Sequence, residues 1–324
     1  MKLYSLLTGA LFILIITRNL SLEEFGAWST ISSLLSYAAA LAVANYWTTR
    51  LRARGVEQAT ATALALSLLL SAPATLAYLA ASGRAARAFD IPRDALLLSV
   101  AYVPALYAHS ALYSSALGSR PLAAAASEAV FETAKLSSAA LLSLARGVSL
   151  RGALASVLVG YAAQLAALAW LLRGDLRRRP SSDVARRILS LTPAALPSLL
   201  PPLIGGLDVP LLSALVSNEA VAYYTVVLPF ANAVSYSYFL ARGLYPALLA
   251  GSGGEGLLEE ALRMVALTAV PSAMGVAVAA PFLLYVLRPE YTAAAPVLAA
   301  AAVTAAVAAF GAVAVSPMAP DASD

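Results

Sequence analysis

The chain has 324 residues, of which 61% are hydrophobic and 12% charged, with a formal net charge of +4. Soluble domains average about 25% charged and about 45–50% apolar residues, so this composition excludes an ordinary soluble protein and predicts an integral membrane protein. The absence of cysteine excludes disulfides and thiolate metal sites, and a single histidine excludes a multi-histidine site, so we expect no metal and no cofactor.

Ten hydrophobic segments approach or exceed the length of about 20 apolar residues that a membrane-spanning helix needs. In chain order they are residues 3–17, 25–48, 59–81, 95–117, 122–145, 152–172, 188–216, 220–250, 258–287 and 293–315. The first segment is short for a span and is expected to be tilted or extended by its flanks. The sequence therefore predicts an all-α, polytopic integral membrane protein with about ten transmembrane helices.

Arginine and lysine are distributed unequally between alternate loops. With the N-terminus inside, 13 of the 21 basic residues lie in or beside inner loops, seven lie in outer loops, and Lys135 lies within a helix. The positive-inside rule favours this orientation. We therefore expect a multi-pass protein of the plasma membrane with a cytoplasmic N-terminus, and the modest net charge predicts no nucleic-acid partner.

A short signature occurs twice, 196 residues apart. Residues 21–29 read Ser-Leu-Glu-Glu-Phe-Gly-Ala-Trp-Ser, and residues 217–225 read Ser-Asn-Glu-Ala-Val-Ala-Tyr-Tyr-Thr. The same offset pairs Pro121 with Pro317 and Asp94 with Glu290. Self-similarity at a fixed offset is typical of an internally duplicated architecture, and in a membrane protein it favours a transporter built from two halves.

The polar, arginine-rich segment after the sixth span marks the predicted boundary between the halves. We predict an N-terminal six-helix lobe at residues 1–173, a basic cytoplasmic linker at 174–187, and an incomplete C-terminal lobe of about four helices at 188–324. The lobes are expected to be parallel repeats, with a shortened second copy of a twelve-helix design. The arginines of the linker serve either as a topology signal or as a contact to anionic lipid headgroups.

Three ionisable residues lie within the fifth span. Glu128, Glu132 and Lys135 are spaced by four and three residues, which places them on one helix face. Glu132 lies about 15 Å from the start of the span, at 1.5 Å per residue. Charged groups at this depth usually face a bundle interior or a water-filled cavity. They either line such a cavity or form a self-neutralising Glu132–Lys135 pair, which leaves Glu128 as a net negative charge.

The seventh span combines an acid with several helix-breaking residues. Asp208 is a candidate cavity residue there, either near the binding region or near the outer interface. Proline removes backbone donors and bends helices, and broken helices are common at the binding regions and hinges of transporters. The hinge candidates are Pro197, Pro201, Pro202, Gly205 and Gly206.

Four further polar residues are candidates for the substrate path. Arg242, near the inner end of the eighth span, either extends to the interface or binds a phosphate. Tyr236 and Tyr238 lie deeper in the same span, where their hydroxyls are suited to bind a sugar. Arg18 lies at a helix end and is either an interfacial anchor or a cavity residue.

Four stretches of the chain resemble polysaccharide-repeat-unit flippases. Residues 18–26, Arg-Asn-Leu-Ser-Leu-Glu-Glu-Phe-Gly, are similar to the end of helix one in that family, and residues 208–224 to its passage between helices seven and eight. Residues 244–248, Leu-Tyr-Pro-Ala-Leu, resemble the end of its helix eight, and residues 288–298 its passage between helices nine and ten. These flippases belong to the multidrug/oligosaccharidyl-lipid/polysaccharide exporter superfamily.

The resemblance implies two lobes forming a V around a cavity that opens alternately to each side. It implies that the cargo is a polyprenyl-linked oligosaccharide, moved from the inner to the outer leaflet for polysaccharide or glycoprotein assembly. The implied partners are membrane lipid, the lipid-linked oligosaccharide and glycan-assembly enzymes.

Three alternatives remain open beside this flippase. The first is a cation-coupled multidrug exporter of the same superfamily that uses Glu128, Glu132 and Asp208, and the second is a non-transporting truncated remnant. The third, a membrane-embedded enzyme of glycan assembly, is disfavoured because the longest outer loop, near residues 81–94, is small. No catalytic signature is present, so we predict that the protein is not an enzyme.

Overall fold

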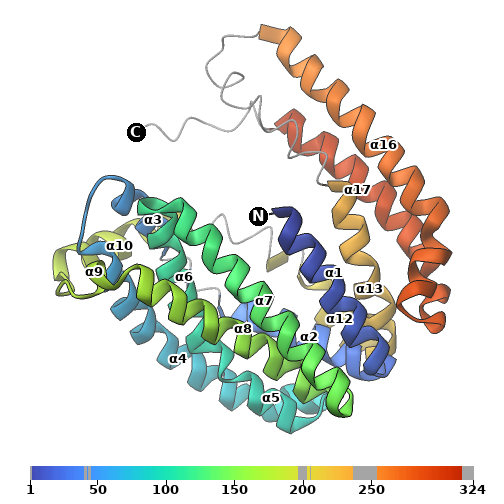
Figure 1. Cartoon of the computed structure of the whole chain (residues 1–324), viewed down its shortest axis with the longest axis horizontal. Coiled ribbons are helices and arrows are strands. Elements are labelled where there is room, and N and C mark those ends of the chain that lie inside the picture. Colours follow the sequence, from blue (N-terminus) through green and yellow to red (C-terminus); the bar gives the residue numbers. More distant parts are fainter. Residues whose placement is uncertain are drawn as a thin grey trace. The chain divides into compact units, whose positions relative to one another are not determined.

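The structure, a computed structural model, describes residues 2–39, 42, 45–195, 203–204, 206–235 and 254–315. Within these ranges every regular element is a helix and none is a strand (Figure 1). The chain divides into two compact units, Met1–Ala222 and Tyr223–Asp324. The all-helical class predicted from the sequence is confirmed.

The helices of the first unit follow the predicted spans in order. They are α1 (Lys2–Asn19), α2 (Leu22–Ala38), α3 (Tyr46–Ala53), α4 (Ala59–Ala88), α5 (Arg93–Ser99), α6 (Tyr102–Ser119), α7 (Pro121–Arg146), α8 (Leu150–Leu171), α9 (Arg173–Leu176), α10 (Ser182–Ala195) and α12 (Asp208–Leu215). Helix α13 (Asn218–Ser235) begins in this unit and continues into the second.

Several predicted spans are divided between two helices. The segment 95–117 forms α5 and α6, which separate just before Pro104, whose ring lacks an N–H and is hindered by the carbonyl four residues earlier. The segment 25–48 ends as α2 at Ala38 and resumes as α3. The segment 188–216 is represented by the end of α10 and by α12, with residues 196–202 and 205 outside the described part of the chain.

The contacts between loops define two ends of the first unit. At one end, here called the basic end, Arg52 forms a 3.0 Å ion pair with Asp175 and Arg120 donates to the carbonyl of Leu171. At the opposite end, Arg151 pairs with Asp94, and Asn19 accepts from the backbone of the loop between α7 and α8. Successive loops therefore alternate between the two ends, as expected of helices that cross a membrane repeatedly.

The two copies of the repeated signature adopt the same local structure. Ser21 caps α2, because its hydroxyl accepts from the backbone N–H of Glu24 at 3.1 Å. Ser217 caps α13 in the same way, with the N–H of Ala220 also 3.1 Å away. Because the acceptor and donor are three residues apart in both copies, the offset of 196 relates equivalent helix starts. The superposition of two complete lobes stays a prediction.

The two helix starts also contact each other. A Cβ at Gly26 would lie 1.7 Å from the carbonyl oxygen of Asn218, so only glycine allows α2 to approach the start of α13 this closely. The Asn218 amide in turn donates to the carbonyls of Phe89 and Asp90 at 2.8 and 3.0 Å. The second copy of the signature is thereby held against the first, at the end opposite the basic end.

The second unit is built around a long helical pair. It contains α16 (Gly254–Leu287), the short 3-10 helix η4 (Pro289–Ala294) and α17 (Ala295–Val315). Small side chains on α16 and α17, including Ala261, Ala269, Ala302 and Ala306, pack together with Val234 of α13. Close helix packing through small residues is typical of membrane proteins, where apolar burial alone does not drive helices together.

Five helical stretches among the described residues are long and apolar enough to cross a membrane. They are Ala59–Ala88, Arg93–Ser119, Leu150–Leu171, Glu259–Leu287 and Pro289–Gly311. Other predicted spans coincide with α1 and α2, which are shorter, and with α7, which carries three charges in its middle. The composition and these helices together define a polytopic membrane protein.

Candidate functional site

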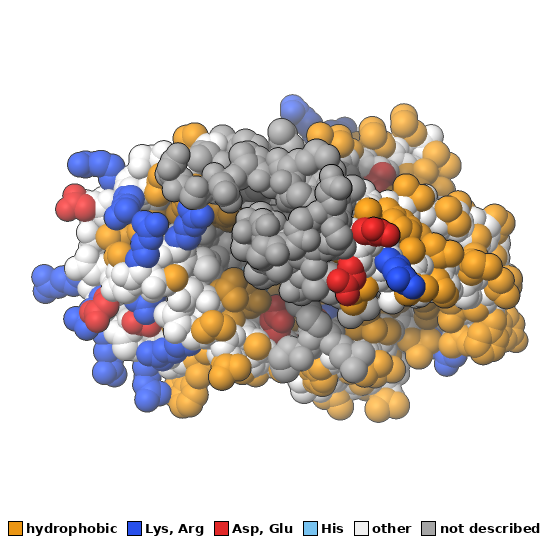
Figure 2. All heavy atoms as spheres, turned by 90° about the horizontal axis from the view of Figure 1, so that it is seen from above, with side chains coloured by type: hydrophobic (Ala, Val, Ile, Leu, Met, Phe, Trp, Pro, Cys, Tyr) orange, Lys and Arg blue, Asp and Glu red, His pale blue; other side chains and the backbone are white. Residues whose placement is uncertain are grey.

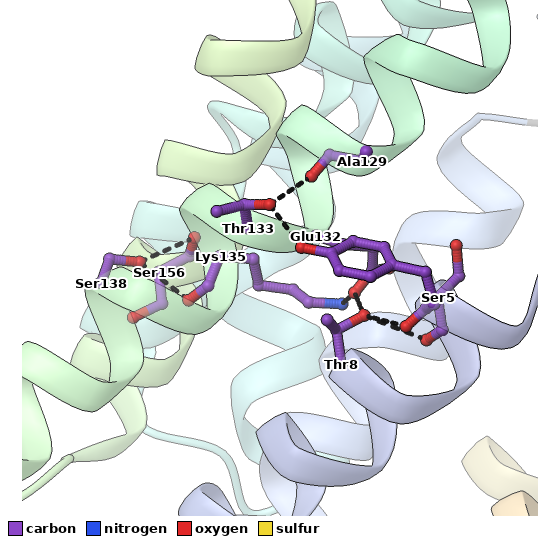
Figure 3. A network of polar contacts seen from close by, with 9 residues as sticks. Ser5, Thr8, Ala129, Glu132, Thr133, Lys135, Ser138 and Ser156 are labelled. Atoms are coloured by element: carbon purple, nitrogen blue, oxygen red, sulfur yellow. Dashed lines mark hydrogen bonds and ion pairs between the residues drawn. The ribbon is translucent and has the colours of Figure 1, made fainter. Parts of the chain in front are cut away.

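The middle of α7 carries an ion pair. The ammonium group of Lys135 lies 2.7 Å from a carboxylate oxygen of Glu132, and their side chains are only 10% and 13% exposed. Figure 3 shows both side chains turned toward α1. The intrahelical pair considered from the sequence is therefore formed, and its two charges neutralise each other where water is scarce.

Helix α1 supplies one face of polar and aromatic groups to this pair. The hydroxyl of Thr8 donates to Glu132 at 3.1 Å, and the hydroxyls of Tyr4 and Thr133 are 2.6 Å apart. The ring of Phe12 lies 5.1 Å from the Lys135 ammonium. Positions 4, 8 and 12 recur every four residues and so share one face of the helix. The carboxylate, the ammonium and the hydroxyls thus form one network between α1 and α7.

The Lys135 side chain occupies a narrow space between α7 and α8. Its ammonium lies 4.9 Å from the centre of the Phe131 ring, an attractive cation–π geometry. On α8, a Cβ at Gly160 would lie 3.0 Å from that ring and 3.1 Å from the Cβ of Lys135. Glycine at this position therefore makes room for both side chains.

Glu128 has a different environment one turn earlier on α7. Its carboxylate accepts a 2.6 Å hydrogen bond from Tyr113 of α6. The Tyr113 ring stacks on His109, whose ring meets Tyr161 of α8 edge-on. Within the described residues, Glu128 is paired with this neutral hydroxyl and not with a cation. Glu128, Glu132 and Lys135 together therefore carry a formal charge of −1.

A second group of polar contacts lies between α2 and the start of α12. Ser33 donates to the carbonyl of Gly206 and Tyr37 to the carbonyl of Leu203, both at 3.0 Å. Asp208 accepts from the N–H of Val209 and lies close enough to Tyr37 to interact electrostatically. Tyr37 also lines an apolar groove of about 380 Å³ between α2 and α4. Helix α2 therefore supplies the donors that the interrupted seventh span lacks.

The remaining candidates fall into three cases. Arg18 lies exposed in the last turn of α1, about 15 Å along that helix from Thr8. The hinge candidate Gly206 takes part in the α2 contact described above. Seven other candidates lie outside the described residues: Pro197, Pro201, Pro202, Gly205, Tyr236, Tyr238 and Arg242.

The sequence alone does not indicate the partners of the acidic residues. Thr8 and Tyr113 carry no charge and lie on helices distant in the sequence, so nothing in α7 pointed to them. The four-residue spacing of Tyr4, Thr8 and Phe12 was the available signal, because it marks one polar and aromatic face on an otherwise aliphatic helix.

The network can hold charge and hydrogen bonds. No three His, Cys, Asp or Glu residues among those described are grouped as metal ligands would be. A cation approaching Glu128 would meet a carboxylate, a tyrosine hydroxyl and aromatic rings, which are favourable partners for a positive charge. The site is thus suited to bind or sense a charged or hydroxylated ligand.

The fold is similar to that of solved transporters. No protein-family model and no curated protein sequence matches the chain. A MATE transporter in a bent conformation is matched with a TM-score of 0.57 at 16% identity, over 97% of this chain and 77% of that one. A MOP-superfamily transporter from Pyrococcus furiosus is matched with a TM-score of 0.50 at 15% identity, over 97% and 81%. The chain therefore has the fold of MATE and MOP-superfamily transporters, while membership of that superfamily and of its flippase family stays a prediction.

Proposed function

We propose that the protein is a membrane transporter that moves a polyprenyl-linked oligosaccharide from the inner to the outer leaflet, without any covalent change, for polysaccharide or glycoprotein assembly. The observation that carries this proposal is that Glu128, Glu132 and Lys135 lie well inside α7, a predicted membrane span, with the Thr8 hydroxyl of α1 bonded to Glu132. Ionisable groups at that depth are costly and usually serve a pathway. The likeness of the fold to transporters and the flippase-like motifs support it.

One observation favours a second candidate, a cation-coupled multidrug exporter. Glu128 is a carboxylate paired with the neutral hydroxyl of Tyr113, whose ring stacks on His109. That environment is suited to a coupling ion or an organic cation. The Pyrococcus furiosus neighbour is described as having a binding pocket of reversed polarity that suggests a different function, so pocket charge is the property to test.

Liposome transport with two cargoes distinguishes the candidates. The purified protein is reconstituted with a fluorescent polyprenyl-diphospho-oligosaccharide, and a membrane-impermeant quencher measures how much of the label changes leaflet. In parallel liposomes, release of ethidium is followed under an imposed proton or sodium gradient. We expect the protein to accelerate movement of the lipid-linked sugar and to leave ethidium in place.

A pair of variants links transport to the network. Glu128→Gln removes the unneutralised carboxylate, and Asp183→Asn removes an exposed carboxylate of α10 outside the network. We expect the first to reduce transport at least tenfold and the second to leave it unchanged. Gradient-driven ethidium release that Glu128→Gln abolishes would establish the exporter instead. Movement of neither cargo would support the non-transporting remnant.

A further inference from the structure

Positive charge is concentrated at the basic end of the first unit. Residues 50–58, 120 and 173–187 contain ten arginines and three acids, a formal charge of +7. The opposite end, residues 18–24, 84–94, 146–151 and 219, contains six arginines and five acids, a formal charge of +1. Figure 2 shows Lys and Arg side chains gathered at the end where Figure 1 places α3, α9 and α10.

Helices α9 and α10 are fixed to the body of the unit. The buried Arg52–Asp175 pair holds α9, and Arg178 forms a 2.7 Å ion pair with Glu57. At the start of α10, the N–H of Ser181 donates to Thr62 at 2.9 Å. Near its end, the Trp47 indole donates to the carbonyl of Leu191 at 2.7 Å, and Ile188 is fully buried. The segment predicted to be a linker is therefore a platform against α3 and α4.

Four arginines on this platform are exposed and have no ion pair among the described residues. They are Arg177, Arg179, Arg186 and Arg187. Asp183 lies one turn before the last two, but no ion pair joins it to either within the described part of the chain. Four guanidinium groups that form no ion pair with the described residues, held on fixed elements, are available to bind anions.

Aromatic residues place this surface at the level of lipid headgroups. Trp170 ends α8 with 64% of its surface exposed, and the Arg173 guanidinium stacks on it at 5.1 Å. Arg50 stacks on Trp47 at 5.3 Å on the neighbouring α3. Tryptophan is typical of the boundary between hydrocarbon and water, so the arginines that follow lie where lipid phosphates lie. Leu189, 45% exposed on α10, adds an apolar contact beside them.

We propose that α9 and α10 bind the anionic headgroups of inner-leaflet phospholipids through Arg177, Arg179, Arg186 and Arg187. Bidentate guanidinium–phosphate contacts provide a defined binding geometry as well as charge attraction. A juxtamembrane arginine typically adds about fivefold in affinity for an anionic surface. This role is independent of the cargo, because the platform lies at the end of the helices and the polar network lies in their middle.

Native mass spectrometry with equal amounts of phosphatidylglycerol and phosphatidylcholine tests this surface. The purified wild-type protein is expected to retain phosphatidylglycerol preferentially, and the preference should fall as ammonium acetate rises, because exposed charges are screened. The combined variant Arg177→Gln, Arg179→Gln, Arg186→Gln and Arg187→Gln should lose at least tenfold of that preference. The two-residue variant Arg177→Gln with Arg179→Gln should lose an intermediate amount.

The matched control removes four exposed arginines from the opposite end: Arg84, Arg87, Arg93 and Arg146, each changed to Gln. It should retain phosphatidylglycerol as the wild type does. Equal retention of both lipids by the wild type would overturn the proposal. Undiminished phosphatidylglycerol retention in the four-residue variant, or equal losses in it and in the control, would do the same and leave the arginines as topology signals only.

Discussion

At the scale of single residues, the ion pair on α7 is costly to bury and is stabilised by its contacts. Taking Glu132 and Lys135 out of water is unfavourable, and the 2.7 Å contact, the Thr8 hydroxyl and two aromatic rings offset that cost. Removing one partner should therefore destabilise the protein more than breaking a surface ion pair would. Glu128 is not part of this ion pair, so its carboxylate is the one whose charge is available to a ligand.

Breaking the pair from one side is expected to destabilise the protein. Glu132→Gln leaves the 10% exposed Lys135 ammonium without its counter-charge, which should cost about 3 kcal/mol, the lower limit for a buried pair. Removing both charges, in Glu132→Gln with Lys135→Met, should recover most of that loss. Apparent unfolding temperatures in detergent are compared for Glu132→Gln, Lys135→Met and the double variant. A loss in the double variant equal to the sum of the two single losses would contradict the prediction.

At the scale of elements, the contacts of α2 determine how the second signature is held. Its first turns meet the start of α13 at Gly26, and its later turns supply Ser33 and Tyr37 to the carbonyls before α12. Helix α2 therefore donates hydrogen bonds to the carbonyls before α12 and contacts the start of the helix that follows. Two predictions test these contacts separately.

The close approach at Gly26 is expected to tolerate no larger residue. Gly26→Ala places a methyl group against a backbone carbonyl that cannot rotate away, and overpacking of this kind costs about 1–3 kcal/mol. Gly9→Ala on α1 is the control, because a Cβ there meets nothing within 4 Å and alanine favours the helix by up to about 1 kcal/mol. Unfolding temperatures should move in opposite directions, and equal shifts would show that the contact is not tight.

The hydroxyls of Ser33 and Tyr37 are each expected to contribute a small, separate amount to the free energy of unfolding. Ser33→Ala and Tyr37→Phe each leave one carbonyl without its donor, at a cost of about 0.6 kcal/mol, the average for hydrogen bonds between membrane helices. Ser36→Ala is the control, because that hydroxyl bonds within its own helix to Ser32. Unfolding temperatures as low for Ser36→Ala as for Ser33→Ala would contradict a specific role for the carbonyl contact.

At the scale of the whole molecule, the alternation of loops between the two ends agrees with a chain that crosses the membrane repeatedly. The charge difference between those ends predicts the orientation, with the basic end in the cytoplasm. The arrangement of residues 1–173 and 188–324 as parallel lobes stays a prediction.

Single cysteines test the orientation directly, because the chain has none of its own. Ser182→Cys lies exposed at the basic end, and Ala145→Cys lies exposed at the opposite end. In intact cells, a membrane-impermeant maleimide should label the cysteine at position 145, and it should label the one at 182 only after permeabilisation. The reverse pattern would place the N-terminus outside.

The sequence by itself determined the class of the protein, the order of its helices and the presence of charge within α7. These follow from composition, from hydrophobic length and from spacing along one helix, all of which are local properties. It also located the repeated helix starts, because the capping pattern at Ser21 and Ser217 extends over three residues.

Only the tertiary structure decided which residues those charges meet. Thr8 and Tyr113 reach α7 from other helices, and Asn218 reaches Gly26 from almost 200 residues away. The tertiary structure also divided the span at 95–117 between two helices. It attached α9 and α10, which include most of the predicted linker at 174–187, to α3 and α4. Such partners depend on how helices pack in three dimensions, and an apolar membrane helix shows little of its packing face in its hydrophobic pattern, because lipid and protein neighbours are equally apolar.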